Sequence, residues 1–376
     1  MESPIYIPIF RLRQQEKDVL TTFDFGKEIY PYLEIFKKQP RKSPPRRPNA
    51  KSKPKEPKKF HEHFLPILNK IKSDKIFVDL PVHLIRKKKM KDDVIEFLLT
   101  VIENRGERTR YIKSLSSCAK MIPVISTYAT ITNEQDSIRL QEADLRETFS
   151  TLAFRTSEKS LHNDLQQIES VAQSQDFVFL DLGELDLSNT DDFETAEFLM
   201  SKLKNFNKCS VVLINSSLSH NLTNSGLEHG KIIEGASNLI LDKYSTLGAH
   251  CFSDYAGVKK DLVEEGGVIS PGLLFYDPIE NAYYGFKGRK WQKNVKRNFD
   301  DIRGVILKDL LTAEFITRIK GSHLEYLGKQ NQGWNMVEGM WDETIQWRNQ
   351  ARLKRIAMEH YLHCIRTKIF AGTFMN

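Results

Sequence analysis

The sequence predicts an α/β fold of the (β/α)8 TIM-barrel type, and three observations support this prediction. The chain has 376 residues, which is enough for one such barrel with additions to it. Short apolar runs recur along it, and amphipathic stretches with helical spacing lie between most of them. The runs number eight and cover residues 5–10, 29–36, 75–80, 121–126, 151–156, 176–182, 209–215 and 248–254.

Strands that alternate with helices pair in parallel through right-handed crossovers. Eight such units close most naturally into a barrel. A doubly wound open sheet is the alternative architecture, and its first turn is usually rich in glycine. The first apolar run here continues instead with the sequence RLRQQ at residues 11–15. We therefore expect the barrel.

The stretches between the runs carry the predicted helices. Residues 92–102 show the pattern clearly, because two aspartates open the stretch and Val94, Leu98 and Val101 share one face. Similar spacing occurs at 60–71, 161–172 and 193–203, and more weakly at 136–147 and 217–244.

After the eighth run we expect a β-hairpin and then a C-terminal helical cap. The hairpin strands are predicted at 270–277 and 282–287, and the cap helices at 299–319 and 337–370 with a loop between them. The chain then divides into 1–36 for the first two barrel strands, 37–59 for an insertion, 60–298 for the rest of the barrel with the hairpin, and 299–376 for the cap.

Composition excludes several classes of protein. Hydrophobic residues make up 40% of the chain and charged residues 28%, so a sizeable core is expected. The longest apolar runs fall short of the roughly 18 residues of a membrane-spanning helix, so we expect no membrane association. Four cysteines lie far apart without a C-x-x-C pair. This spacing argues against a disulfide framework or a zinc knuckle and favours the reducing cytoplasm.

The insertion at 37–59 is a basic, proline-rich tract. It holds eleven Lys or Arg, one Glu and six of the fourteen prolines. Its net charge is therefore +10, and the rest of the chain carries −3 of the overall +7. Because the tract has no large apolar side chain, we expect it to be disordered and polyproline-like.

The tract has two interpretations. One is an arm that binds the phosphates of nucleic acid through its positive charge. The other is a solvated linker, which is favoured because the tract has no aromatic side chain to stack on bases. The candidate nucleic-acid-binding residues are Lys37, Lys38, Arg41, Lys42, Arg46, Arg47, Lys51 and Lys53.

Charged side chains lie in the predicted strands or at their ends, and in a barrel these positions converge on one rim, where active sites are built. The carboxylates are Glu34, Asp79, Asp181 and Asp254, and the arginines are Arg11 and Arg155. The carboxylates are candidate ligands for Mg²⁺ or Mn²⁺, and the arginines would then clamp a phosphate.

This arrangement would suit a metal-dependent phosphodiesterase or nucleotide hydrolase, with His360 as the proton donor to the leaving group. The other interpretation is a set of structural ion pairs inside the barrel mouth. His360 and His363 share a helix face and could form a metal pair, although an ordinary pair of helix histidines is the favoured interpretation.

Several motifs resemble the beta protein family of phages and bacteria. Residues 6–16, YIPIFRLRQQE, are similar to that family's opening pattern, Y-x-P-x-x-[RK]-x-[RK]-Q-x-E, and residues 31–34, PYLE, are similar to the strand that follows. The segment FSDY at 252–255 resembles a related bacterial branch. Near the end, MEHY at 358–361 departs from the family's M-H-H-L motif, because Glu359 replaces its first histidine.

This resemblance implies a barrel-like α/β fold and a biological context, but no particular reaction. Members occur in phages, mobile elements and defence-associated gene neighbourhoods, sometimes beside a nuclease-like protein. It therefore implies a component of phage–host conflict, or antiviral defence, that binds nucleic acid or a nuclease-like or phage protein partner. The motif positions include Arg11, Arg13, Gln14, Glu34, Asp79, Asp181, Asp254 and Tyr255.

Overall fold

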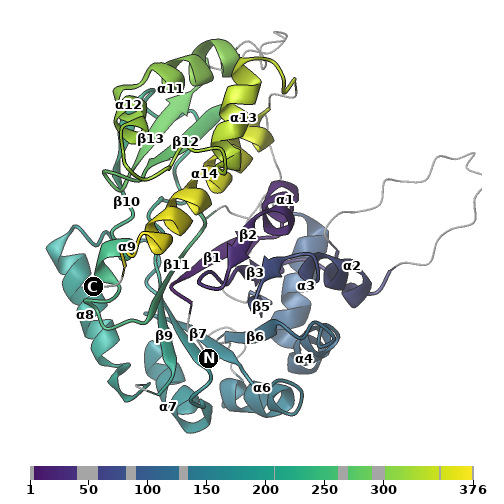
Figure 1. Ribbon diagram of the computed structural model, residues 1–376. Helices are drawn as coiled ribbons and strands as arrows, with labels where there is room; N and C mark the ends of the chain where they lie inside the picture. The colour runs from purple at the N-terminus through teal and green to yellow at the C-terminus, as the bar shows by residue number, and fades with distance from the viewer. Residues whose placement is uncertain are drawn as a thin grey trace, which may run out of the picture.

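The computed structural model describes residues 4–39, 58–81, 90–126, 134–206, 208–260, 270–289, 301–346 and 349–374. Eight parallel strands close a barrel in the order β1-β11-β9-β8-β7-β6-β5-β3 (Figure 1). The strands are β1 (Tyr6–Arg11), β3 (Tyr32–Glu34), β5 (Ile76–Asp79), β6 (Met121–Ser126), β7 (Ala153–Ser157), β8 (Phe177–Asp181), β9 (Ser210–Ile214) and β11 (Cys251–Asp254). Each predicted apolar run supplies one strand. The barrel prediction is confirmed, and the open-sheet alternative is wrong.

The strand side chains alternate between the barrel interior and the surrounding helices, as the period of two requires. Ile7 and Ile9 of β1 belong to the apolar cluster inside the barrel, together with Phe77, Phe179 and other strand residues. Their neighbour Phe10 belongs to the larger core under the helices. The interior is therefore a packed core and not a channel.

Helices cover the outside of the barrel. They are α1 (Gln14–Thr22), α2 (Phe60–Leu68), α3 (Asp92–Glu103), α4 (Arg105–Lys113), α6 (Ser137–Arg146), α7 (Leu161–Val171), α8 (Thr190–Ser201) and the short α9 (Ile240–Lys243). Local chemistry sets their ends. The side chain of Asn189, for example, accepts hydrogen bonds from the backbone N–H groups of Asp191 and Asp192 in the first turn of α8. A small parallel pair, β2 (Asp24–Gly26) with β4 (Lys72–Ser73), lies outside the barrel.

A cap built on a three-stranded antiparallel sheet lies beyond the end of the barrel where α1 begins (Figure 1). The predicted hairpin is confirmed as β12 (Gly272–Asp277) and β13 (Ala282–Lys287). A third strand, β10 (Lys231–Ser237), pairs with β13, and it lies in a stretch for which a weak helix was predicted. The prediction of a helix at 217–244 is therefore wrong, except for the four residues of α9.

The C-terminal helices pack around this sheet. They are a π-helical turn (Ile302–Leu307), α11 (Lys308–Thr312), α12 (Glu314–Lys320), α13 (Gln332–Trp341) and α14 (Gln350–Phe370). The predicted helix at 337–370 is therefore two helices, α13 and α14, and α13 begins inside the predicted loop. The domain boundaries stay predictions, and most of the tract at 37–59 lies outside the described residues.

Helix α14 joins the cap to the barrel (Figure 1). Its Gln350 side chain bonds both the N–H and the C=O of Gly272 on the outer edge of β12, at 2.7 and 2.9 Å. At the barrel, Lys354 of α14 forms an ion pair with Glu16 of α1 at 2.7 Å. Within the described residues, no helix is long and apolar enough to cross a membrane.

Candidate functional site

Five of the predicted site residues meet inside the end of the barrel. Arg11, Glu34, Asp79, Arg155 and Asp181 are the last or nearly the last residues of β1, β3, β5, β7 and β8. We call these five residues the mouth cluster. Register places Arg11 beside Glu34, and Glu34 beside Asp79, on adjacent strands. Arg155 and Asp181 are not register partners, because Arg155 pairs with Phe179 and Asp181 pairs with Ser157. All five side chains nevertheless share the strand face that points into the barrel.

The guanidinium of Arg155 is the centre of the mouth cluster. Its Nη1 donates to Glu34 Oε1 at 2.8 Å and lies 3.6 Å from Asp79 Oδ2. Its Nη2 donates to Asp181 Oδ2 at 2.6 Å. The same guanidinium also donates to the hydroxyls of Tyr32 and Tyr255. One side chain from β7 thus reaches carboxylates on three other strands.

Glu34 connects the two arginines. Its second oxygen, Oε2, accepts from Arg11 Nε at 2.6 Å, and its side chain is fully buried. An unpaired carboxylate at this depth would be very costly, whereas one held between two guanidinium groups is compensated. Within the cluster, two guanidinium groups therefore form ion pairs with three carboxylates.

Asp79 lies at the edge of this network, and its carboxyl group has a higher pKa than that of an ordinary aspartate. Burial raises its pKa to about 6, although the charge of Arg155 acts in the opposite direction. Its oxygens accept hydrogen bonds from Tyr32 and Ser126 at 2.9 and 3.1 Å. Asp79 therefore keeps its proton to a higher pH than an exposed aspartate does.

The solvent side of the mouth cluster is formed by Asp181, Tyr255 and Lys260. The Lys260 ammonium lies 3.7 Å from Asp181 Oδ2 and 5.3 Å from the centre of the Tyr255 ring. The sequence offered some indication of these contacts. Tyr32 and Tyr255 belong to the segments PYLE and FSDY, which resemble the family. Lys260 follows the strand β11, but its charge alone did not identify its role at the mouth.

Asp254 lies outside the mouth cluster, which corrects the prediction that four carboxylates share one site. It is on the same face of β11 as Phe252, which packs in the outer core, so its side chain points away from the barrel interior. There it accepts hydrogen bonds from Tyr6 at 2.6 Å, from the backbone N–H of Ala256 at 2.7 Å and from Tyr361 of α14. Burial raises the pKa of Asp254.

His360 also lies away from the mouth cluster, so the structure does not bring it to the place where the predicted proton donor would act. Its ring stacks on Phe275 with 4.0 Å between centres, its Nε2 bonds the carbonyl of Tyr276, and its Nδ1 bonds the amide of Asn331. Burial lowers the pKa of His360 to about 3, so the ring stays neutral. His363 instead contacts the carbonyl of Glu325 at 3.0 Å. The two rings have separate structural partners.

The predicted metal site does not form from these residues. Over the described parts of the chain, no group of three or more His, Cys, Asp or Glu is arranged to hold a metal ion. The physical reason is that Arg11 and Arg155 occupy the space between the carboxylates, and each guanidinium takes the oxygens that Mg²⁺ or Mn²⁺ would need. The residues present fit structural ion pairs better than a metal centre.

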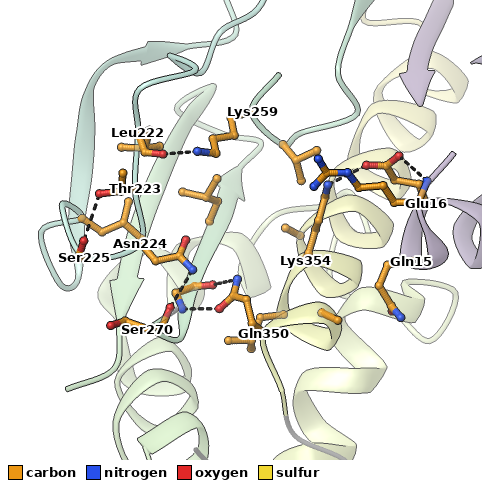
Figure 2. A pocket seen from close by; sticks show the side chains of 18 of the residues that line it. Gln15, Glu16, Leu222, Thr223, Asn224, Ser225, Lys259, Ser270, Gln350 and Lys354 are labelled. Carbon is orange, nitrogen blue, oxygen red and sulfur yellow. Dashed lines mark hydrogen bonds and ion pairs between the residues drawn. The ribbon is translucent and has the colours of Figure 1, made fainter. Parts of the chain in front are cut away.

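A cleft of about 760 Å³ lies next to the mouth, between the barrel and the cap. We call it the α1–β12 cleft. Figure 2 shows Gln15, Glu16 and Lys354 on one wall and Leu222–Ser225 on the other. It is lined by Arg13, Gln14, Gln15, Glu16, Leu222, Thr223, Asn224, Ser225, Leu227, Val258, Lys259, Ser270, Gly272, Leu274, Gln350, Ala351, Leu353, Lys354 and Ala357.

The family model described as Beta protein matches residues 6–366, nearly the whole chain. The chain belongs to the beta protein family. No curated protein matches it. The membership confirms the resemblance carried by the opening motif.

In this beta protein, the side chains of the opening motif lie in two different sites. Arg11 points into the mouth cluster, whereas Arg13, Gln14 and Glu16 line the α1–β12 cleft. The cleft was not predicted, because its other walls come from residues more than two hundred positions away. Of the predicted nucleic-acid-binding residues, Lys37 is half-buried and Lys38 is exposed, and the other six lie outside the described residues.

Proposed function

We propose that this protein is a cytoplasmic component of phage–host conflict, or antiviral defence. It binds nucleic acid through its basic tract and a protein partner through its folded body. The proposal starts from family membership, which supplies the context. The arginines and carboxylates of the mouth cluster are already paired with one another. This arrangement supports a binding role better than a catalytic one.

The place where the tract leaves the barrel carries the nucleic-acid part of the proposal. β3 ends at Glu34, and the tract begins at Lys37, so its +10 charge starts on the same rim as the mouth cluster and the α1–β12 cleft. A chain with this charge attracts phosphates whatever the base sequence. Nucleic acid held by the tract would therefore lie near the barrel mouth.

Salt dependence of binding tests this part. Fluorescence anisotropy would follow a labelled DNA duplex with the wild type and with a variant in which Arg41, Lys42, Arg46 and Arg47 are replaced by Gln. Each phosphate contact contributes about −0.9 to the slope of log K against log salt. We therefore expect the variant's slope to be shallower by up to about 3.6.

A charge-matched control replaces Lys70, Lys72, Lys202 and Lys208, which are exposed elsewhere on the molecule, with Gln. It should keep the wild-type slope. Equal affinity and slope in the tract variant and the wild type would contradict the nucleic-acid part. Plaque counts on cells that carry the gene with its neighbours test the defence part, and we expect protection to be lost in the tract variant.

A metal-dependent phosphodiesterase or nucleotide hydrolase is the alternative. It would need the mouth carboxylates as ligands, but these hold Arg11 and Arg155. Thermal unfolding with added Mg²⁺ or Mn²⁺ distinguishes the two functions. We expect no change in melting temperature for the wild type or for Asp181→Asn. A metal-dependent rise that Asp181→Asn lacks would support the enzyme instead.

A further inference from the structure

We propose that the α1–β12 cleft is the docking site for an extended peptide segment of the protein partner, and that this segment carries acidic and aliphatic side chains. The inference rests on the proposed binding function and adds to it the place and the chemistry of the contact. Three properties of the cleft support it: its apolar floor, its excess of positive charge and the absence of aromatic rings among the lining residues that the structure describes.

The floor of the cleft is aliphatic and comes from both parts of the molecule. Val258 follows the barrel strand β11, Leu274 belongs to β12 of the cap, and Leu353 belongs to α14. Leu222 and Leu227 complete it from the opposite wall. A volume of about 760 Å³ lies within the range of about 300–1,000 Å³ usual for ligand sites. Such a surface is suited to leucine-like side chains.

The charged residues of the cleft favour an acidic ligand. Among the described residues, three cations, Arg13, Lys259 and Lys354, line it together with one carboxylate, Glu16, so these lining residues have a net charge of +2. Glu16 is already paired with Lys354. The ammonium of Lys259 donates to the carbonyls of His220 and Leu222, which hold it in place without cancelling its charge. The N-terminus of α1 adds a partial positive charge at the same wall.

A peptide explains this lining better than a strand of nucleic acid. Proteins that bind unpaired bases stack them on aromatic side chains, and the described part of the lining includes no Phe, Tyr or Trp. Acidic side chains of a peptide can instead reach Arg13 and Lys259 while aliphatic ones contact Leu274. The tract and the cleft would thus bind different molecules on one rim.

The test uses a fluorescein-labelled peptide of alternating glutamate and leucine and measures anisotropy with the full chain. We expect the wild type to bind it, and Lys259→Gln and Leu274→Ala each to lose about ten-fold or more in affinity, or about 1.4 kcal/mol. The matched controls are Lys202→Gln and Leu140→Ala, which change exposed residues far from the cleft and should bind as the wild type does. Melting curves show which variants are folded.

Two further peptides test the specificity of the cleft. A lysine–leucine peptide tests the role of charge, and a glutamate–serine peptide tests the aliphatic contact. Both should bind at least about ten-fold more weakly than the glutamate–leucine peptide. Equal binding of the lysine–leucine peptide, or equal affinity of the cleft and control variants, would overturn the inference.

A labelled single-stranded oligonucleotide separates this inference from the proposed function. If it binds through the tract while the glutamate–leucine peptide does not bind, the cleft inference fails and the nucleic-acid function stands. If Lys259→Gln abolishes oligonucleotide binding with the tract unchanged, the cleft is a nucleic-acid site and the peptide inference is wrong. Loss of binding in the tract variant alone, with peptide binding intact, supports both parts.

Discussion

Two buried carboxylates, Glu34 and Asp254, lie on opposite faces of the same barrel wall and are stabilised in different ways. Glu34 faces the interior and is held between Arg11 and Arg155. Asp254 faces outward and accepts hydrogen bonds from Tyr6 and other neutral donors, with no ion pair to a cation among the described residues. Both lie at strand ends. The face of the strand, and not the distance from its end, decides which chemistry surrounds a carboxylate.

The two environments also differ in what they hold together. The ion pairs of the mouth cluster connect barrel strands to one another. The outer site connects the barrel to the cap, because Tyr361 of α14 bonds Asp254 and packs edge-on against Tyr6 with 6.4 Å between ring centres. The mouth cluster therefore stabilises the barrel itself, and the outer site stabilises the docking of α14.

Removing the central cation should have the largest effect. Arg155→Met leaves Glu34 with Arg11 and Asp181 with the more distant Lys260, in a buried site, so we expect a loss of about 4 kcal/mol in unfolding free energy. Urea unfolding measures it. The control Arg110→Met breaks an exposed pair with Glu107 and should cost less than about 1 kcal/mol. Similar losses in the two variants would show that the mouth charges are not a stabilising network.

The acidity of Asp79 should make the mouth cluster sensitive to pH. Burial raises its pKa from 3.8 to about 6 in the folded protein, so the folded state keeps this proton to a higher pH than the unfolded chain does. Its contribution to unfolding free energy should therefore fall by about 3 kcal/mol as the pH rises from about 4 to about 6, and then stay level.

The difference between wild type and Asp79→Asn in urea unfolding isolates this contribution. We expect the variant to gain stability relative to the wild type across that pH range. A difference that is constant with pH would show that Asp79 titrates alike in both states.

A glycine tests the outer interface without changing a charge. An alanine Cβ at Gly257 would lie 2.3 Å from Tyr361 Cγ, and φ is +71°. Gly230 has the same φ, with open space around its Cβ position. Both alanine variants are strained, but Gly257→Ala should lose about 2 kcal/mol more in urea unfolding because α14 must move. Equal losses would mean that α14 is free to shift on the barrel.

The smallest effect is expected for one hydroxyl of the outer site. Tyr6→Phe removes a donor to Asp254 and should cost about 1 kcal/mol in unfolding free energy. Tyr244→Phe is the control, because that tyrosine is also buried and its hydroxyl has no hydrogen bond to the described residues. An unchanged unfolding free energy for Tyr6→Phe would show that the remaining hydrogen-bond donors are sufficient for Asp254.

Much of the barrel could be predicted from the sequence because its strands are nearly continuous apolar runs, the signature of strands buried on both faces. Helix α1 was missed because only Glu16, Val19 and Leu20 of its residues are buried, too few for a clear apolar face. Strand β10 was missed because much of it is exposed, and its pairing with β13 includes a register irregularity.

The candidate site could be predicted only in part. The convergence of Arg11, Glu34 and Arg155 follows from parallel strands ending on one rim. Which face Asp254 takes depends on register, because a shift of one residue reverses every side chain of a strand. The α1–β12 cleft depends on how α14 lies against α1 and β12, and no local pattern in the chain encodes that contact.

The way α14 covers β12 also limits how a partner can approach. An exposed sheet edge invites another chain to add a strand through main-chain hydrogen bonds. Here the side chain of Gln350 takes the N–H and C=O of Gly272, and His360 takes the carbonyl of Tyr276, so α14 already occupies these main-chain groups of the edge. With these groups taken, strand addition along β12 is disfavoured, so a partner in the cleft is selected mainly by its side chains, and recognition depends on its sequence.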